Sequence, residues 1–172
     1  MIKKSVLMIL PAQDFNEQEY LIVYNSLIKR GLKVFIASDA NTICTSSSGL
    51  KVKNDISFFN MREANFNGIV FIGGKGVKAY WDNLQLHNLV RKFLQMKKTI
   101  GAICSAPVIL AMAGILNGIN AVCFSEDRKE LERERANYTD SPVVVSKNII
   151  TGQNPAAAKE FINTFINEFE KE

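Results

Sequence analysis

Short apolar runs alternate with segments of helical periodicity along most of the chain. Continuous apolar runs are typical of strands covered on both faces, and they occur at 6–10, 32–37, 68–72 and 98–103. In the intervening segments, apolar residues recur three and four positions apart. This spacing predicts amphipathic helices at about 20–28, 84–94 and 105–115.

The second half of the chain continues the same alternation. It predicts a strand at 120–124 and a charged helix at 125–135, whose acid–base pairs three or four residues apart are typical of a solvated face. Two further apolar runs, 143–145 and 149–151, predict a pair of strands joined by a short turn. This βαβ succession predicts an α/β fold with a mostly parallel sheet and helices on both faces. Residues 1–172 are of a length that suits a single domain.

Composition excludes several classes of function. The net charge of +4 comes from scattered lysines and arginines rather than from a basic stripe, so we expect no nucleic-acid surface. Cys44, Cys104 and Cys123 show no CxxC or metal-ligand spacing, and an odd number of cysteines without a secretory signal favours free thiols in the cytoplasm. No apolar run is long enough to cross a bilayer. We therefore expect a cytoplasmic protein that binds no membrane, metal or organic cofactor.

Cys104 stands where a strand-like run meets a helical pattern, with Ala102 two residues before it and Ala106 two residues after it. A sharp strand-to-helix turn needs small neighbours and presents its central side chain at the apex. A thiol at a helix N-terminus also gains stability as a thiolate. These features predict a nucleophile elbow. The alternative is a buried structural cysteine.

A glycine turn, Gly73-Gly74, follows the run at 68–72 and should reach the same edge of the sheet as Cys104. Such a turn can offer a backbone N–H to an oxyanion, together with the N–H of Ser105. The alternative is a loop that needs glycine only for a positive φ.

Two glutamates, Glu17 and Glu19, lie where the first helix begins. A carboxyl group that stays protonated beside a thiol can donate a hydrogen bond to the thiolate and stabilise it. The spacings Asn16–Glu19 and Asp14–Glu17 also fit capping boxes, in which the glutamate only closes the helix end. The residues alone leave both roles and both glutamates open.

Gly73-Gly74, the segment 102–107 and the acidic start of the first helix together resemble the ThiJ/PfpI superfamily, which includes a parkinsonism-associated protein, intracellular peptidases and stress chaperones. The resemblance implies a flavodoxin-like three-layer sandwich with a nucleophilic Cys104. It implies a glutamate partner twelve residues before the glycine that ends the first helix. Counting back from Gly31 gives Glu19, with Glu17 in reserve.

The same resemblance implies an oxyanion site built from the N–H groups of Gly74 and Ser105, and a homodimer or larger homo-oligomer. The sequence also departs from the family pattern. Ser105 stands where peptidase-like members carry histidine, and Phe124 stands where other members carry histidine or tyrosine. The only histidine, His87, is expected on a helix surface, so no Cys–His pair is visible.

Without a base beside the thiol, the site is poorly equipped to protonate an amide leaving group. The leading hypothesis is therefore a glyoxalase- or deglycase-like enzyme, in which the Cys104 thiolate adds to a small aldehyde and Glu19 shuttles protons. A redox sensor or chaperone whose Cys104 oxidises to sulfinate is the second hypothesis. An intracellular peptidase or amidase is the third.

Overall fold

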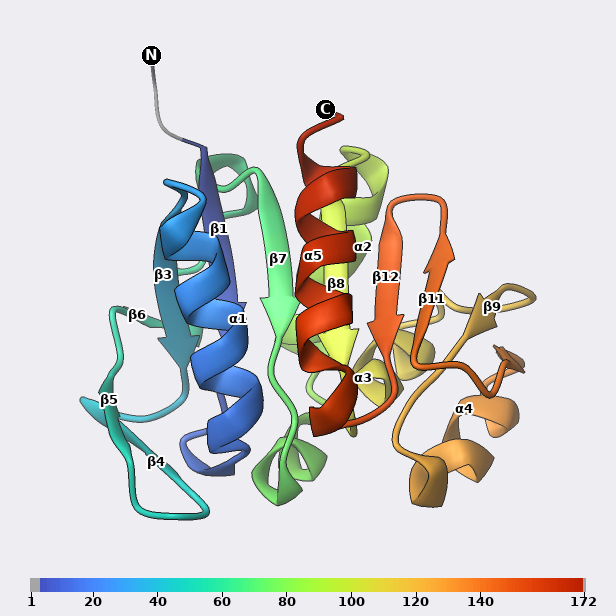
Figure 1. Cartoon of the computed structure of the whole chain (residues 1–172), viewed down its shortest axis with the longest axis horizontal. Coiled ribbons are helices and arrows are strands. Elements are labelled where there is room, and N and C mark those ends of the chain that lie inside the picture. Colours follow the sequence, from blue (N-terminus) through green and yellow to red (C-terminus); the bar gives the residue numbers. More distant parts are fainter. Residues whose placement is uncertain (1–3, 172) are drawn as a thin grey trace.

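The computed structural model describes residues 4–171, and residues 1–3 and 172 of the expected domain lie outside the described part (Figure 1). Within that range the chain builds a seven-stranded sheet in the order β11-β12-β8-β7-β1-β3-β6. Neighbouring strands are parallel except for the β11–β12 pair. The strands are β1 Ser5–Ile9, β3 Lys33–Ser38, β6 Ile56–Ser57, β7 Gly68–Phe71, β8 Thr99–Ile103, β11 Val143–Ser146 and β12 Ile149–Gly152.

Helices cover both faces of this sheet. The helices are α1 Glu17–Lys29, α2 Leu84–Gln95, α3 Pro107–Met112, α4 Arg128–Arg133 and α5 Ala158–Phe169. Figure 1 shows α1 and α5 side by side in front of the sheet, with α2 and α3 behind it. Because side chains alternate along a strand, Val6 and Met8 pack in the core under α1 and α5, whereas Leu7 and Ile9 pack in the core under α2 and α3. The expected flavodoxin-like three-layer sandwich is confirmed.

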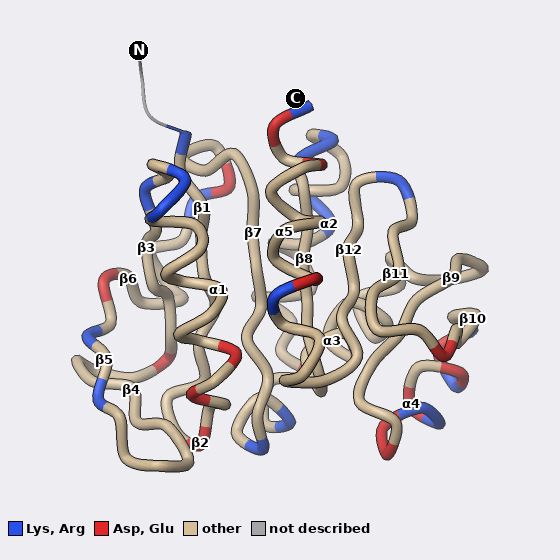
Figure 2. Tube along the Cα trace, viewed as in Figure 1, with Lys and Arg blue, Asp and Glu red and all other residues tan. Residues whose placement is uncertain are grey.

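Short strands and 3-10 turns lie in the segments between these strands and helices. Charged residues occur at many separate places along the trace rather than on one element (Figure 2). No helix among residues 4–171 is long and apolar enough to cross a membrane. The short elements are the strands β2 Gln13–Phe15, β4 Ile43–Ser46, β5 Lys51–Lys53, β9 Asn120–Ala121 and β10 Asn137–Tyr138, and the 3-10 turns η1 Phe58–Asn60, η2 Glu63–Asn65, η3 Lys75–Tyr80, η4 Ser125–Asp127 and η5 Pro155–Ala157.

The structure corrects the expected strand at 120–124. Only Asn120–Ala121 is a strand, and it pairs with β10 outside the main sheet. The place beside β8 is taken by β12, which comes later in the chain. The N–H of Val122 donates instead to the Thr151 side chain, at 3.0 Å.

Two expected helices are shorter than the segments predicted for them. The segment expected at 105–115 contains only α3, because the elbow turn uses the residues before Pro107 and Gly114 follows the helix at φ 82°. The segment expected at 125–135 divides into η4 and α4.

Candidate functional site

Cys104 lies at the carboxyl end of β8 in a backbone conformation that side chains rarely adopt, with φ 63°. Neighbouring strands and loops hold this conformation in place. The Cys104 N–H donates to the Gly152 carbonyl at 2.9 Å, and its own carbonyl accepts from the Phe124 N–H at 2.7 Å. The side chain is 7% exposed, whereas Cys44 and Cys123 are fully buried. The backbone therefore has the form expected of a nucleophile elbow.

Glu19, in the first turn of α1, lies against Cys104. Asn16 is the N-cap of α1, and its side chain accepts from the Glu19 N–H at 2.9 Å. The Glu19 carboxyl does not close a capping box. It turns inward, and its Oε2 accepts the Gly73 N–H at 2.8 Å. Its Oε1 is buried and has no hydrogen-bond partner among residues 4–171. The Cys104 thiol lies against the same carboxyl.

Glu19 and Cys104 form a coupled acidic pair. Burial raises the pKa of Glu19 from 4.5 to about 7, even though the Gly73 N–H and the Cys104 thiol stabilise its charged form. Burial, followed by the negative charge of Glu19, raises the pKa of the Cys104 thiol well above its usual range. The stabilised thiolate was expected beside a protonated carboxyl, and the state in which Glu19 is ionised opposes it. In that state, two negative charges would share one buried site.

Glu17, the reserve candidate, points elsewhere. Its carboxylate accepts hydrogen bonds from the hydroxyls of Ser46 and Ser48, on β4 and the turn that follows it. No hydrogen bond joins Glu17 to the thiol among the described residues. Of the two glutamates, the structure brings only Glu19 to the thiol.

The glycine turn packs directly against the elbow. A Cβ atom on Gly73 would lie 2.7 Å from the Cys104 Cβ and 2.9 Å from Glu19 Oε2, so no side chain fits there. Gly74 has φ 110°, a conformation that favours glycine. Gly74 also lines a cavity of about 320 Å³ in which Cys104, Ser105 and Phe124 meet. Gly74 and Ser105, the residues expected to supply the oxyanion N–H groups, thus line the same cavity as Cys104.

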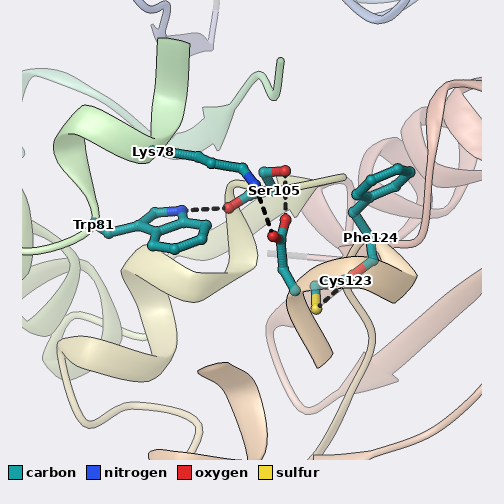
Figure 3. Close-up of polar contacts among 6 residues, drawn as sticks. Lys78, Trp81, Ser105, Cys123 and Phe124 are labelled. Carbon is teal, nitrogen blue, oxygen red and sulfur yellow. Dashed lines mark hydrogen bonds and ion pairs between the residues drawn. The ribbon is translucent and has the colours of Figure 1, made fainter. Parts of the chain in front are cut away.

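A charged network that the sequence did not predict lies on the other side of the elbow. The Ser105 hydroxyl donates to Asp127 Oδ2 at 2.5 Å, and Lys78 Nζ forms an ion pair with Asp127 Oδ1 at 2.9 Å (Figure 3). Asp127 is only 4% exposed, although it lies in the charged segment that the sequence assigned to a solvated face. The one available signal was position, because Asp127 follows Phe124 by three residues and Phe124 was already expected near the site.

A second contact that the sequence did not predict holds the backbone of Ser105, the residue after Cys104. The Trp81 indole N–H donates to the Ser105 carbonyl at 2.8 Å, and the two groups face each other in Figure 3. His87 Nε2 lies 2.7 Å from the Trp81 carbonyl. His87 is 5% exposed, so its expected place on a helix surface is wrong. The buried face of α2 is broad enough to include His87 at its edge. There the imidazole forms a hydrogen bond with the Trp81 carbonyl.

The remaining thiols lie apart from this site. Cys44 lies on β4 and is fully buried. Cys123 packs in the core under α2 and α3, whereas Cys104 packs in the core under α1 and α5. All three cysteines are free thiols. No group of three or more His, Cys, Asp or Glu side chains within residues 4–171 could hold a metal ion.

Comparison with known proteins places this geometry in a family. A sequence model described as the DJ-1/PfpI family matches residues 4–168. The chain belongs to the DJ-1/PfpI family. The resemblance to the ThiJ/PfpI superfamily is therefore confirmed.

Three relatives illustrate the range of the family. An uncharacterized protein of Methanocaldococcus jannaschii is 34% identical over 96% of this chain and 82% of its own length. A deglycase of Pyrococcus horikoshii is 27% identical over 91% of this chain and 95% of its own length. A glutathione-independent glyoxalase of Caenorhabditis elegans is 26% identical over 98% of this chain and 90% of its own length.

Among solved structures, a ThiJ/PfpI domain protein from Brachyspira murdochii superimposes with a TM-score of 0.95. It is 29% identical, and the match covers 99% of both chains. The fold of this protein is thus nearly the same throughout, including the elements that carry the elbow and the glycine turn.

Proposed function

We propose that this protein is a cysteine-dependent enzyme that converts small reactive α-oxoaldehydes, such as methylglyoxal, with Cys104 as nucleophile and Glu19 as proton shuttle. The observation that carries the proposal is the contact between the Glu19 carboxyl and the Cys104 thiol, beside a cavity of about 320 Å³. The names of two relatives, a deglycase and a glutathione-independent glyoxalase, support the same class of substrate.

The first step needs only one proton to move within the pair. The Cys104 proton passes to the Glu19 carboxylate as the sulfur bonds to the aldehyde carbon, so no second negative charge develops on the pair. The carbonyl oxygen becomes an alkoxide, which the N–H groups of Gly74 and Ser105 stabilise. Glu19 then gives its proton to that oxygen, which yields a hemithioacetal.

The remaining steps reuse Glu19. Its carboxylate removes the proton from the former aldehyde carbon and returns it to the adjacent carbonyl carbon. The hydroxyl proton on the former aldehyde carbon moves to the neighbouring oxygen in the same rearrangement, so the hemithioacetal becomes a thioester of a 2-hydroxy acid. Water then cleaves the thioester, releases the acid and restores the thiol. The sum is one aldehyde plus one water giving one 2-hydroxy acid, with no external oxidant. A carboxyl whose pKa is about 7 is suited to give and take protons at neutral pH.

The test is turnover of methylglyoxal by the full-length protein and by Cys104→Ser. We expect the variant to lose activity by at least about a thousandfold, because the nucleophile is removed. Cys44→Ser is the matched control, since Cys44 is fully buried on β4 and does not line the cavity. Unchanged turnover in Cys104→Ser would remove the proposal.

One observation favours a second function, that of a peroxide sensor. Cys104 is 7% exposed and the other two cysteines are fully buried, so peroxide would reach Cys104 first. Two equivalents of hydrogen peroxide would convert its thiol to a sulfinate and release two waters. Intact-mass analysis that finds two added oxygens on Cys104, in a protein that turns over no aldehyde, would favour the sensor.

The peptidase hypothesis has less support. His87 is buried and bonded to the Trp81 carbonyl, so it can serve neither its own site nor that of a neighbouring subunit as a base. Ser105 occupies the position directly after the nucleophile, and its hydroxyl is bonded to Asp127.

A further inference from the structure

The peptide group that joins Cys104 to Ser105 carries one of the two N–H groups assigned above to the alkoxide. Its carbonyl, which belongs to Cys104, accepts the Phe124 N–H at 2.7 Å. The N–H of a planar trans peptide points opposite to its carbonyl, so this hydrogen bond also sets the direction of the Ser105 N–H. No backbone carbonyl within residues 4–171 accepts that N–H, and Ser105 lines the cavity beside Cys104. The N–H is therefore available to an oxygen in the cavity.

The turn η4 holds the same peptide at a second point. The Ser105 hydroxyl donates to Asp127 Oδ2 at 2.5 Å, a short distance typical of donation to a charged carboxylate. The Asp127 N–H in turn donates to the Phe124 carbonyl at 2.9 Å. One short turn thus contacts both residues of the peptide, Cys104 through a backbone N–H and Ser105 through a carboxylate.

The Asp127 carboxylate is itself fixed in direction. Lys78 binds its other oxygen, Oδ1, at 2.9 Å, and the Lys78 ammonium lies 5.3 Å from the centre of the Trp81 ring. The Trp81 indole N–H holds the Ser105 carbonyl at 2.8 Å, so Ser105 is bound through both its hydroxyl and its carbonyl (Figure 3). A buried ion pair is a weak source of stability, so the main consequence of this arrangement is a fixed geometry.

We propose that Asp127 is a positioning residue for the oxyanion site, because it holds the Ser105 hydroxyl so that the Ser105 N–H stays directed at the alkoxide. Asp127 does not line the cavity, and it acts only through Ser105. A donor that is already oriented needs no reorganisation as the negative charge develops. The inference deepens the proposed function and rests on it, since it needs an aldehyde oxygen to become an alkoxide at Cys104.

The experiment is the turnover of methylglyoxal by full-length Ser105→Ala, Asp127→Ala and the double variant, measured as kcat and KM. We expect kcat to fall by about 10- to 100-fold in each single variant while KM changes by less than about twofold, because a misdirected donor weakens only the transition state. The double variant should be no slower than the slower single variant, since Asp127 acts through Ser105. Losses that multiply in the double variant would overturn the proposal.

Alkylation of Cys104 by iodoacetamide separates positioning from a general disturbance of the elbow. Sulfur displaces iodide from carbon in this reaction, and no alkoxide forms that would need the Ser105 N–H. We therefore expect Ser105→Ala to keep the wild-type alkylation rate within about twofold at the pH of the turnover assay. A rate that falls in step with kcat would contradict the proposal, because it would show that the nucleophile itself is damaged. Ser125→Ala, which removes an exposed hydroxyl from the same turn, is the matched control and should leave both rates unchanged.

Asp127→Asn distinguishes the hydrogen bond to Ser105 from the charge of the carboxylate. Lys78 has only protons to donate, so the amide oxygen faces Lys78 and the amide nitrogen donates to the Ser105 hydroxyl oxygen. The contact persists with its direction reversed, and we expect Asp127→Asn to recover most of the kcat that Asp127→Ala loses. Equal losses in the two variants would assign the effect to the charge and overturn the positioning role.

The same assays separate this inference from the proposed function. Wild-type protein that turns over no methylglyoxal would remove the proposed function and this inference with it. Turnover that needs Cys104 but is unchanged in Ser105→Ala would remove the inference only. Ser105→Ala decides the matter alone should an Asp127 variant fail to fold, because it removes only the hydroxyl oxygen from the elbow.

Discussion

Glu19 and Asp127 are two buried carboxyl groups that reach the Cys104 elbow from different faces of the sheet, and their surroundings are opposite in kind. Glu19 comes from α1 and has a backbone N–H and a thiol as partners, with no cation, so burial raises its pKa to about 7. Asp127 comes from η4 and has Lys78 and the Ser105 hydroxyl as partners. The first arrangement suits a group that exchanges protons, and the second suits a fixed acceptor.

The largest effect expected from this comparison is on turnover in Glu19→Gln. Glutamine keeps an oxygen for the Gly73 N–H but cannot give or take a proton, so we expect methylglyoxal turnover to fall by about 100- to 10,000-fold. Alkylation of Cys104 should persist, because removal of the Glu19 charge lowers the cost of forming the thiolate. Glu17→Gln is the matched control, since Glu17 bonds to Ser46 and Ser48 instead. Equal losses in the two variants would contradict the division between the glutamates.

The second effect is on the pH dependence of stability. Between pH 4.5 and about 7 the unfolded chain releases the Glu19 proton while the folded protein keeps it, so the free energy of unfolding falls as pH rises through this range. The full contribution is about 3 kcal/mol, from a shift of about two and a half units. Urea unfolding of wild type and Glu19→Gln at pH 4 to 8 measures it as the difference between the two curves. A difference that is flat with pH would show that Glu19 titrates normally.

The sequence predicted the strands, helices and elbow of this site better than it predicted which charged side chains reach the site. Apolar runs located the strands and helices because a parallel sheet buries both of its faces. The alanines that flank Cys104 predicted the elbow because only small side chains fit beside such a turn. The choice of Glu19 over Glu17 came from family resemblance alone, since capping-box spacing fitted both residues.

Asp127 and His87 were missed for the same physical reason. Each is buried by a contact with another element: Asp127 with Ser105 and Lys78, and His87 with the Trp81 carbonyl. Local charge and periodicity describe only the neighbours along the chain. A polar side chain that is satisfied by a distant partner therefore looks like a surface residue in the sequence.

The third effect is on stability and turnover when Gly73 gains a side chain. It tests whether the glycine turn must pack directly against Cys104 and Glu19. A Cβ on Gly73 would lie 2.7 Å from the Cys104 Cβ and 2.8 Å from the Ile103 carbonyl oxygen, both closer than normal contact. We expect Gly73→Ala to lower the free energy of unfolding by about 1–3 kcal/mol and to reduce turnover as Glu19 is displaced. Gly31→Asn is the control, because it adds a side chain in open space at a φ of 81° that asparagine tolerates. Wild-type stability and turnover in Gly73→Ala would mean that the backbone around Cys104 shifts to accept the methyl group at little cost.

The smallest effect is expected from Lys78→Gln on the Asp127 side. The substitution removes the cation from a carboxylate that is 4% exposed, but the Lys78 side chain itself is 45% exposed, so water can replace it at Oδ1. We therefore expect thermal or urea unfolding to show a loss of only about 1 kcal/mol, between the values for surface and buried ion pairs. Lys75→Gln, at the same cavity, controls for the loss of one positive charge. A loss as large as the full Glu19 contribution would contradict this expectation, because it would show that water does not replace the ammonium at Oδ1 and that Asp127 depends on its cation.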